Sequence, residues 1–222
     1  MRSFRLFVFA LAIGVTGLIP SVARAQNPVA SWQDSWFWGA YGGQTQFPTA
    51  IATTTAPTIG IDWVITRTRF ALNVFAEQSY FNAVSTIPDY PSSAPRRVDL
   101  TDMRRIGFTA MIFTPSWRMI KPYVGGGFAF NFIKEATPQG AFFTTPGARD
   151  TVLKRVKSAR TAGKLFGDVG VMAMLGRFAP FVQYTIMPTQ GTSSWFINGD
   201  GFTTIWKAGV RMNFGTSVDK KW

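Results

Sequence analysis

The sequence contains no histidine and no cysteine, and only 11 of its 222 residues are acidic. Histidine is the usual general base near neutral pH and cysteine the usual thiol nucleophile, so Ser-His and Cys-His catalytic arrangements are excluded. The common zinc sites are excluded for the same reason. A Ser-Lys pair or a carboxylate dyad stays open, but the acidic residues are scattered. We therefore expect a protein that is not an enzyme and that needs no metal and no cofactor.

The chain also lacks a long apolar run after residue 25, although 46% of its residues are hydrophobic and 15% are aromatic. A transmembrane helix needs about 20 consecutive apolar residues. Residues 6–19 form the one clear apolar run, and that run is too short to span a membrane as a helix. The apolar residues must therefore form either a soluble core or a surface that alternates with polar residues.

The short apolar run has the flanks of an export signal. Arg2 and Arg5 precede it, and Ala23 and Ala25 form an A-x-A cleavage pattern behind it. These features predict a signal peptide over residues 1–25, cleaved on export. An uncleaved anchor helix is the alternative, while a lipoprotein anchor is excluded because no cysteine follows. Residues 26–34 would then form a periplasmic N-terminal segment.

Helix signals are almost absent from the remaining chain, which 21 glycines and 13 prolines punctuate. Short stretches rich in β-branched and aromatic residues instead predict strands. The predicted strands cover residues 35–44, 55–65, 69–80, 104–113, 122–133, 159–175, 178–187 and 203–214.

The predicted connections alternate in length. The long connections are residues 45–54, 81–103, 134–158 and 188–202, and the short ones are 66–68, 114–121 and 176–177. Long structureless loops are uncommon in compact soluble domains, whereas long outer loops alternate with short periplasmic turns in outer-membrane barrels. The alternation and the even strand number predict an all-β, eight-stranded, antiparallel up-and-down transmembrane barrel over residues 35–215, followed by a tail over 216–222.

The last predicted strand alternates most clearly. Its apolar set is Trp206, Ala208, Val210, Met212 and Phe214, and its other face carries Lys207, Gly209, Arg211 and Asn213. An apolar-out, polar-in strand of about ten residues is the signature of a transmembrane barrel. A soluble periplasmic barrel that binds a lipid inside is the alternative.

Aromatic residues gather near the predicted strand ends, as expected at membrane interfaces. The predicted periplasmic girdle is Trp36, Trp38, Trp63, Trp117, Tyr123 and Phe214, and the outer girdle is Tyr80, Phe132, Tyr184, Trp195 and Trp206.

Charged residues recur on the predicted inward faces. They are Asp62, Glu77, Arg105, Lys164, Asp168, Lys207 and Arg211. Side chains just fill the interior of an eight-stranded barrel, and a buried charge is costly without a partner. We therefore expect an ion-pair and hydrogen-bond network that plugs the lumen, although some of these charges would instead face water at the barrel mouths. Inward glycines, such as Gly125, Gly127, Gly170 and Gly209, keep open the alternative of a narrow pore or a conduit for small apolar molecules.

Basic residues crowd the predicted long loops. They are Arg96, Arg97, Lys134, Arg149, Lys154, Arg155 and Lys157. Arginine and lysine can clamp the phosphates of lipopolysaccharide, so these loops are candidates for contact with outer-membrane lipids. A merely solvated basic loop is the alternative, and a nucleic-acid role is not expected because no binding module accompanies the charges.

Three stretches resemble a known family. KPYVGGGFAF at 121–130, the Gly-rich hairpin at 167–184 and AGVRMNF at 208–214 are similar to strands of the OmpA/OmpX-like outer-membrane β-barrel superfamily. The resemblance implies a bacterial outer-membrane location, a monomer, and assembly by periplasmic chaperones and the barrel-assembly machinery. It also implies an assembly signal at Trp206, Val210, Met212 and Phe214, although residues 215–222 extend past the usual terminal aromatic.

The family includes enzymes, but the catalytic types resemble one another in using histidine, which this chain lacks. The leading interpretation is a non-enzymatic integral barrel that stabilises the envelope or binds surface ligands.

Overall fold

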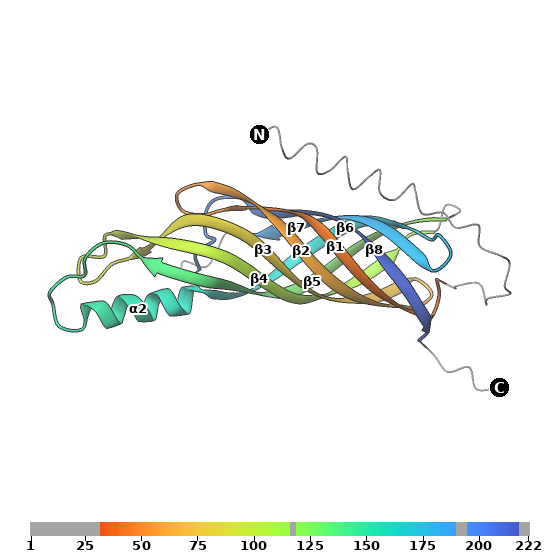
Figure 1. Cartoon of the computed structure of the whole chain (residues 1–222), viewed down its shortest axis with the longest axis horizontal. Helices are drawn as coiled ribbons and strands as arrows, with labels where there is room; N and C mark the ends of the chain where they lie inside the picture. The colour runs from red at the N-terminus through yellow and green to blue at the C-terminus, as the bar shows by residue number, and fades with distance from the viewer. Residues whose placement is uncertain (1–31, 116–118, 190–194, 218–222) are drawn as a thin grey trace.

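The computed structural model describes residues 32–115, 119–189 and 195–217, which form a single closed antiparallel β-barrel with strands in chain order (Figure 1). The strands are β1 (Ser35–Pro48), β2 (Thr53–Thr66), β3 (Phe70–Pro88), β4 (Pro95–Phe113), β5 (Ile120–Pro138), β6 (Thr161–Ala173), β7 (Phe178–Pro188) and β8 (Phe202–Thr216). The predicted all-β class and eight-stranded barrel are confirmed. The predicted signal peptide, its cleavage residues Ala23 and Ala25, and residues 218–222 lie outside the described residues.

Strand β1 pairs with both β2 and β8, and this pairing closes the barrel. The described ends of the chain meet, because the backbone N–H of Ser217 donates to the carbonyl of Asp34 at 2.5 Å. We call this end of the barrel, where β1 begins and β8 ends, the terminal end, and we call the opposite end the far end (Figure 1).

Burial alternates along every strand with the period of two that a pleated strand imposes. The outward residues of the terminal half are large and apolar, and those with the most exposure include Leu165 at 70% and Trp206 at 59%. So many exposed apolar side chains, spread over all the strands, form a surface far larger than the apolar patches of soluble monomers. The predicted assignment of the apolar face to the outside is therefore confirmed.

The far half of the barrel differs from the prediction. Strands β3 and β4 are each 19 residues long, so the predicted loop 81–103 is mostly a hairpin with its turn at 89–94. Likewise, β1 and β2 extend through most of the predicted loop 45–54. The predicted strands end too early because the polarity of the two strand faces reverses here, with apolar residues inward and polar residues outward. Phe81, Ala83 and Ile87 face inward, whereas Asn82 is exposed.

The far end also carries a helix, α2 (Ala148–Ala159), inside the predicted loop 134–158. Its buried side chains, Ala148, Val152, Val156 and Ala159, recur at helical spacing. It follows Gly147, which has a φ of 77° that favours glycine. Figure 1 shows α2 running beside β5 beyond the barrel wall, and it contacts β3, β5 and β6. No helix in the described part of the chain is long and apolar enough to cross a membrane.

Two apolar clusters lie in the interior of the barrel. The terminal cluster is Trp32, Phe37, Tyr41, Val64, Ala71, Met111, Phe113, Tyr123, Met172, Ala179 and Phe181. The far cluster includes Phe47, Phe75, Leu100, Ile133 and Phe166 from the strands, Val152 and Val156 from α2, and Trp195, Phe196 and Ile197 from the segment before β8.

Membership of these clusters corrects the predicted aromatic girdles. Tyr123 and Trp195 are 1% and 2% exposed, so they face the interior and not the barrel surface. Trp117 lies outside the described residues. Tyr123 was assigned to a girdle because it lies near a strand end. Inward and outward residues both occur at strand ends, and only the alternation along the strand distinguishes them.

Candidate functional site

The predicted lumen charges lie between the two apolar clusters. On β4, Arg105 stands between Leu100 of the far cluster and Met111 of the terminal cluster. On β6, Asp168 stands between Phe166 and Met172 in the same way. We call the seven inward charges the polar layer. Its members are Asp62, Glu77, Arg105, Lys164, Asp168, Lys207 and Arg211, and each is at most 9% exposed.

Glu77 is the centre of the larger group in the polar layer. Its Oε1 lies 2.8 Å from the Nε of Arg105, its direct neighbour across the β3–β4 ladder. Its Oε2 lies 3.6 Å from the Nζ of Lys207 and accepts a hydrogen bond from the hydroxyl of Tyr41 at 2.9 Å. The carboxylate thus joins four strands across the lumen. The Arg105 guanidinium also lies over the ring of Phe75, 5.0 Å from its centroid.

Asp62 and Arg211 form the second group. Both the Nε and the Nη2 of Arg211 donate to Asp62 Oδ2, at 3.0 and 2.6 Å. The two residues come from β2 and β8, and Gly39 of β1 stands between them as the register partner of both. A Cβ at Gly39 would lie 2.2 Å from Asp62 Oδ1, so the ion pair requires glycine here. The guanidinium also lies 3.8 Å from the centroid of the Phe181 ring.

Asp168 accepts hydrogen bonds from two hydroxyl groups. Thr109 donates to its Oδ2 at 3.0 Å, and Thr185 donates to its Oδ1. The Nζ of Lys164 lies 5.5 Å from the centroid of the Trp195 ring, at the edge of the far cluster. The structure therefore brings Glu77, Arg105 and Lys207 together and pairs Asp62 with Arg211, while Asp168 and Lys164 have separate surroundings.

The glycines of the inner face make room for neighbouring side chains. A Cβ at Gly170 would lie 2.4 Å from the ring of Tyr123, and one at Gly127 would lie 2.6 Å from the ring of Phe166. The space beside Gly125 is occupied by Thr109, and that beside Gly209 by Tyr41. Neighbouring atoms therefore occupy the space beside each of these four glycines.

Sequence reasoning missed the uncharged partners of the layer, namely Tyr41, Thr109, Tyr123, Gln183 and Thr185. Tyr123 donates to Gln183 Oε1 at 2.9 Å, which ties β5 to β7 across the lumen. Inward parity would have identified these residues on β4 and β5. Strand parity was less useful on β1 and β7, because polar and apolar residues alternate less regularly in the sequences of those two strands.

The far end uses some of the predicted loop cations for its own packing. Arg96 is 7% exposed; its Nη2 lies 2.8 Å from Asp89 Oδ2, and it donates to the carbonyls of residues 139, 140 and 141. The hydrogen bond from Arg96 lowers the pKa of Asp89. Arg155 of α2 donates to the carbonyls of Pro88 and Asp89. These two arginines join the β3–β4 turn to the segments around it.

The remaining predicted cations stand at the surface. Arg97, Lys134, Arg149, Lys154 and Lys157 are exposed. Lys134 lies 3.7 Å from Asp102. On α2, Lys154 and Lys157 lie on the face opposite the buried valines, because the helix buries a single stripe.

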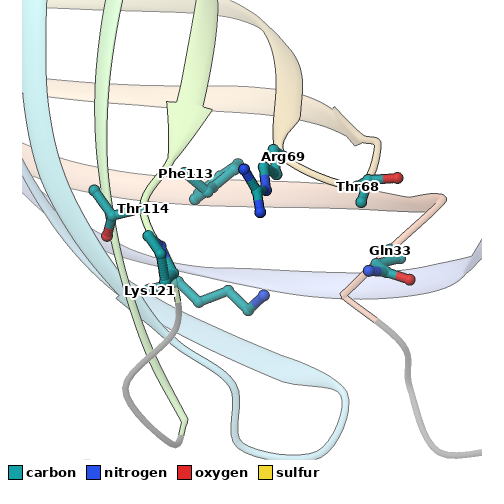
Figure 2. A pocket seen from close by; sticks show the side chains of 7 residues that line it. Gln33, Thr68, Arg69, Phe113, Thr114 and Lys121 are labelled. Atoms are coloured by element: carbon teal, nitrogen blue, oxygen red, sulfur yellow. The ribbon is translucent and has the colours of Figure 1, made fainter.

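The terminal end carries a pocket of about 260 Å³. Figure 2 shows Arg69 and Lys121 extending toward the same open space, with Phe113 and Thr114 on one side and Gln33 and Thr68 on the other. Within the described residues, neither cation has a carboxylate within 4.0 Å. The nearby Arg67, by contrast, pairs with Asp34 at 3.2 Å.

The residues of the predicted assembly signal share the outward face of β8. Trp206, Val210, Met212 and Phe214 are between 36% and 60% exposed. Their role in assembly stays a prediction. Among residues 32–115, 119–189 and 195–217, no three histidine, cysteine or acidic side chains gather where they could hold a metal ion.

No protein-family model matches the chain, and no curated protein matches it in sequence. Solved structures do match. Neisserial surface protein A is 14% identical over 81% of this chain and 97% of its own, with a TM-score of 0.51. The outer membrane protein OprG from Pseudomonas aeruginosa is 11% identical over 85% of this chain and 100% of its own, with a TM-score of 0.49. Ail, the attachment invasion locus protein of Yersinia pestis, is 8% identical over 82% of this chain and 99% of its own, with a TM-score of 0.44.

At these identities the likeness concerns the fold alone. The chain has the fold of small outer-membrane β-barrels, as its sequence resemblance predicted.

Proposed function

We propose that this protein is a non-enzymatic integral barrel of the bacterial outer membrane, with a lumen filled by side chains and a basic far end that binds lipopolysaccharide. The main support for a filled lumen is the central ion-pair group. Glu77, Arg105 and Lys207 meet in the middle of the lumen, each at most 6% exposed, with apolar clusters above and below them.

The exposed apolar surface supports a membrane location. In water, outward residues such as Leu165 and Trp206 would leave a large apolar area exposed, whereas in lipid they meet an apolar solvent. We expect the protein to stay with membranes after carbonate extraction and to migrate faster on gels before heating than after. Release into the carbonate supernatant would instead support a soluble periplasmic barrel.

A filled lumen has a direct electrical test. A charge left in a low-dielectric interior is costly without a partner, so the ion pairs favour a closed packing over a water-filled path. We expect the full chain in planar bilayers to give no steady single-channel current. Steady, large open-channel currents would contradict a filled lumen.

Binding to lipopolysaccharide depends on the cations that remain exposed. Because Arg96 and Arg155 already hold the β3–β4 turn, we take the binding surface to be Arg97, Lys134, Arg149, Lys154 and Lys157. Arginine and lysine bind phosphate through charge-assisted hydrogen bonds, which salt weakens when they are exposed.

The test compares two variants with equal charge changes. Lys154→Gln with Lys157→Gln alters the far end, whereas Arg67→Gln with Arg177→Gln alters the terminal end. We expect the first pair to weaken binding to lipopolysaccharide micelles several-fold, with the loss diminishing as salt rises, and the second to leave binding unchanged. Equal affinities for both variants and the parent protein, or affinity independent of salt, would count against this surface.

A further inference from the structure

The pocket at the terminal end brings together two cations, Arg69 and Lys121. Arg69 immediately precedes β3 and Lys121 lies at the start of β5, the strands on either side of β4, and both residues line the pocket. In the part of the chain that the structure describes, neither has a carboxylate partner. This differs from the polar layer and from the far end, where Arg105, Arg211 and Arg96 are each paired with an acid.

Aromatic packing holds Lys121 and closes the pocket on its inner side. The Lys121 Nζ lies 4.9 Å from the centroid of the Trp32 ring, and Trp32 packs edge-on against Phe113 at 4.4 Å. Phe113 in turn contacts Tyr123, with 5.5 Å between the ring centroids. Because Phe113 is only 4% exposed, this aromatic group separates the pocket from the polar layer. The pocket is thus a blind site at the mouth of the barrel.

The remaining lining residues suit an anion. Thr68, Thr114 and Gln33 bring neutral polar side chains, and none of the lining residues in the described part of the chain is acidic. An arginine and a lysine placed together suit the negative charge and the oxygens of a phosphate group, with the guanidinium binding two oxygens and the ammonium acting as a compact charge. The volume of about 260 Å³ is below the roughly 300–1,000 Å³ of sites for drug-sized ligands, so a small group fits better.

We propose that Arg69 and Lys121 form a phosphate-binding site at the periplasmic mouth of the barrel. The phosphate comes either from a free inorganic anion or from the headgroup of a lipid in the periplasmic leaflet. The site is separate from the proposed lipopolysaccharide surface, which lies at the far end.

The first arm of the test uses inorganic phosphate. The full chain is titrated in a phosphate-free maltoside detergent and followed by calorimetry and phosphorus NMR. We expect saturable binding that falls at least about tenfold in Arg69→Gln and in Lys121→Gln, since each removes one charge-assisted contact. Arg67→Gln is the matched control, because its side chain pairs with Asp34, and it should bind as the parent does. Gel mobility before and after heating checks that every variant is folded.

The second arm distinguishes the source of the phosphate. The protein is placed in nanodiscs with or without phosphatidylglycerol, and bound lipid is counted by native mass spectrometry. Retention of one lipid, lost in Arg69→Gln but not in Arg67→Gln, assigns the site to a headgroup, and binding in the first arm alone assigns it to the free anion. The proposal is overturned if neither ligand binds, or if Arg69→Gln and Lys121→Gln bind as tightly as the parent. Either result leaves the filled lumen and the lipopolysaccharide surface untouched.

Discussion

The terminal half of the barrel wall and its extension at the far end both alternate inward and outward residues along each strand. The two regions differ in which face is apolar. In the terminal half, residues such as Val210 and Phe214 face outward and Arg211 faces inward. In the extension, Val98 and Leu100 face inward and Arg97 faces outward. Alternation of inward and outward residues therefore predicts the strand, whereas the polarity of the outward face indicates the surrounding solvent.

The two regions also fill their interiors differently. The terminal half holds paired charges that cross the lumen, whereas the far end holds the apolar stripe of α2 and the segment at 195–197. Removing one partner of a buried ion pair leaves the other charge unpaired in the interior, which should destabilise the whole barrel. Removing a contact of α2 should instead cause local unfolding of the helix and leave the rest of the barrel folded. Substitutions in each region should therefore affect stability differently.

Glu77→Gln should destabilise the whole barrel. It leaves Arg105 and Lys207 buried without their carboxylate, and breaking a buried pair costs about 3–5 kcal/mol. The free energy of unfolding in lipid vesicles, measured by denaturant titration with gel mobility as the readout, checks this. A loss below about 1 kcal/mol would mean that the two cations find water or other partners.

Val156→Asp should release α2 and leave the terminal half folded. Val156 is 4% exposed within the far cluster, so an unpaired carboxylate there should cost about 2–4 kcal/mol of helix docking. Hydrogen exchange should accelerate over residues 148–159 but not over β8. Leu153→Asp, on the same helix at a residue that is 39% exposed, is the matched control. Equal effects of the two variants would contradict the docking described here.

Arg96→Gln should loosen the β3–β4 turn by about 1.5–3 kcal/mol, the range for hydrogen bonds to charged groups. It should also remove a pH dependence. Because the pKa of Asp89 is lowered in the folded state, its stabilisation is present above the unfolded value of about 3.9 and is lost as the pH falls through the lower folded value. Hydrogen exchange of residues 89–94, corrected for intrinsic rates, should show this loss in the parent but not in the variant. Identical pH profiles would contradict it.

Gly39→Ala should cost about 1–3 kcal/mol, as overpacking commonly does, because its Cβ would displace the Asp62–Arg211 pair. Gly42→Ala is the control on the same strand, since the nearest atom to its added Cβ would be 3.9 Å away. Thermal unfolding of the two variants should differ accordingly, and similar losses would show that the inner face is not tightly packed at Gly39.

The strands of the terminal half could be predicted from the sequence because apolar outward residues alternate there with polar or small inward residues. It predicted the inward direction of Glu77 and Arg105 from parity alone, but not their pairing, because register depends on both strands. It missed α2 because the helix has only one narrow apolar stripe, interrupted by basic residues. Arg96 looked like a surface cation because the strand that turns it inward lay within a predicted loop.

Cysteine accessibility tests the filled lumen most directly, because the chain has no native cysteine. Ser79 faces inward, is 1% exposed and hydrogen-bonds to Thr58, and Ser79→Cys changes its volume little. Ser92→Cys, at the exposed far turn, is the control. A membrane-impermeant thiol reagent should label the Ser92→Cys variant rapidly and leave the folded Ser79→Cys variant unlabelled from either side. Labelling of both variants at similar rates would show that water fills the lumen and would contradict the side-chain packing proposed for it.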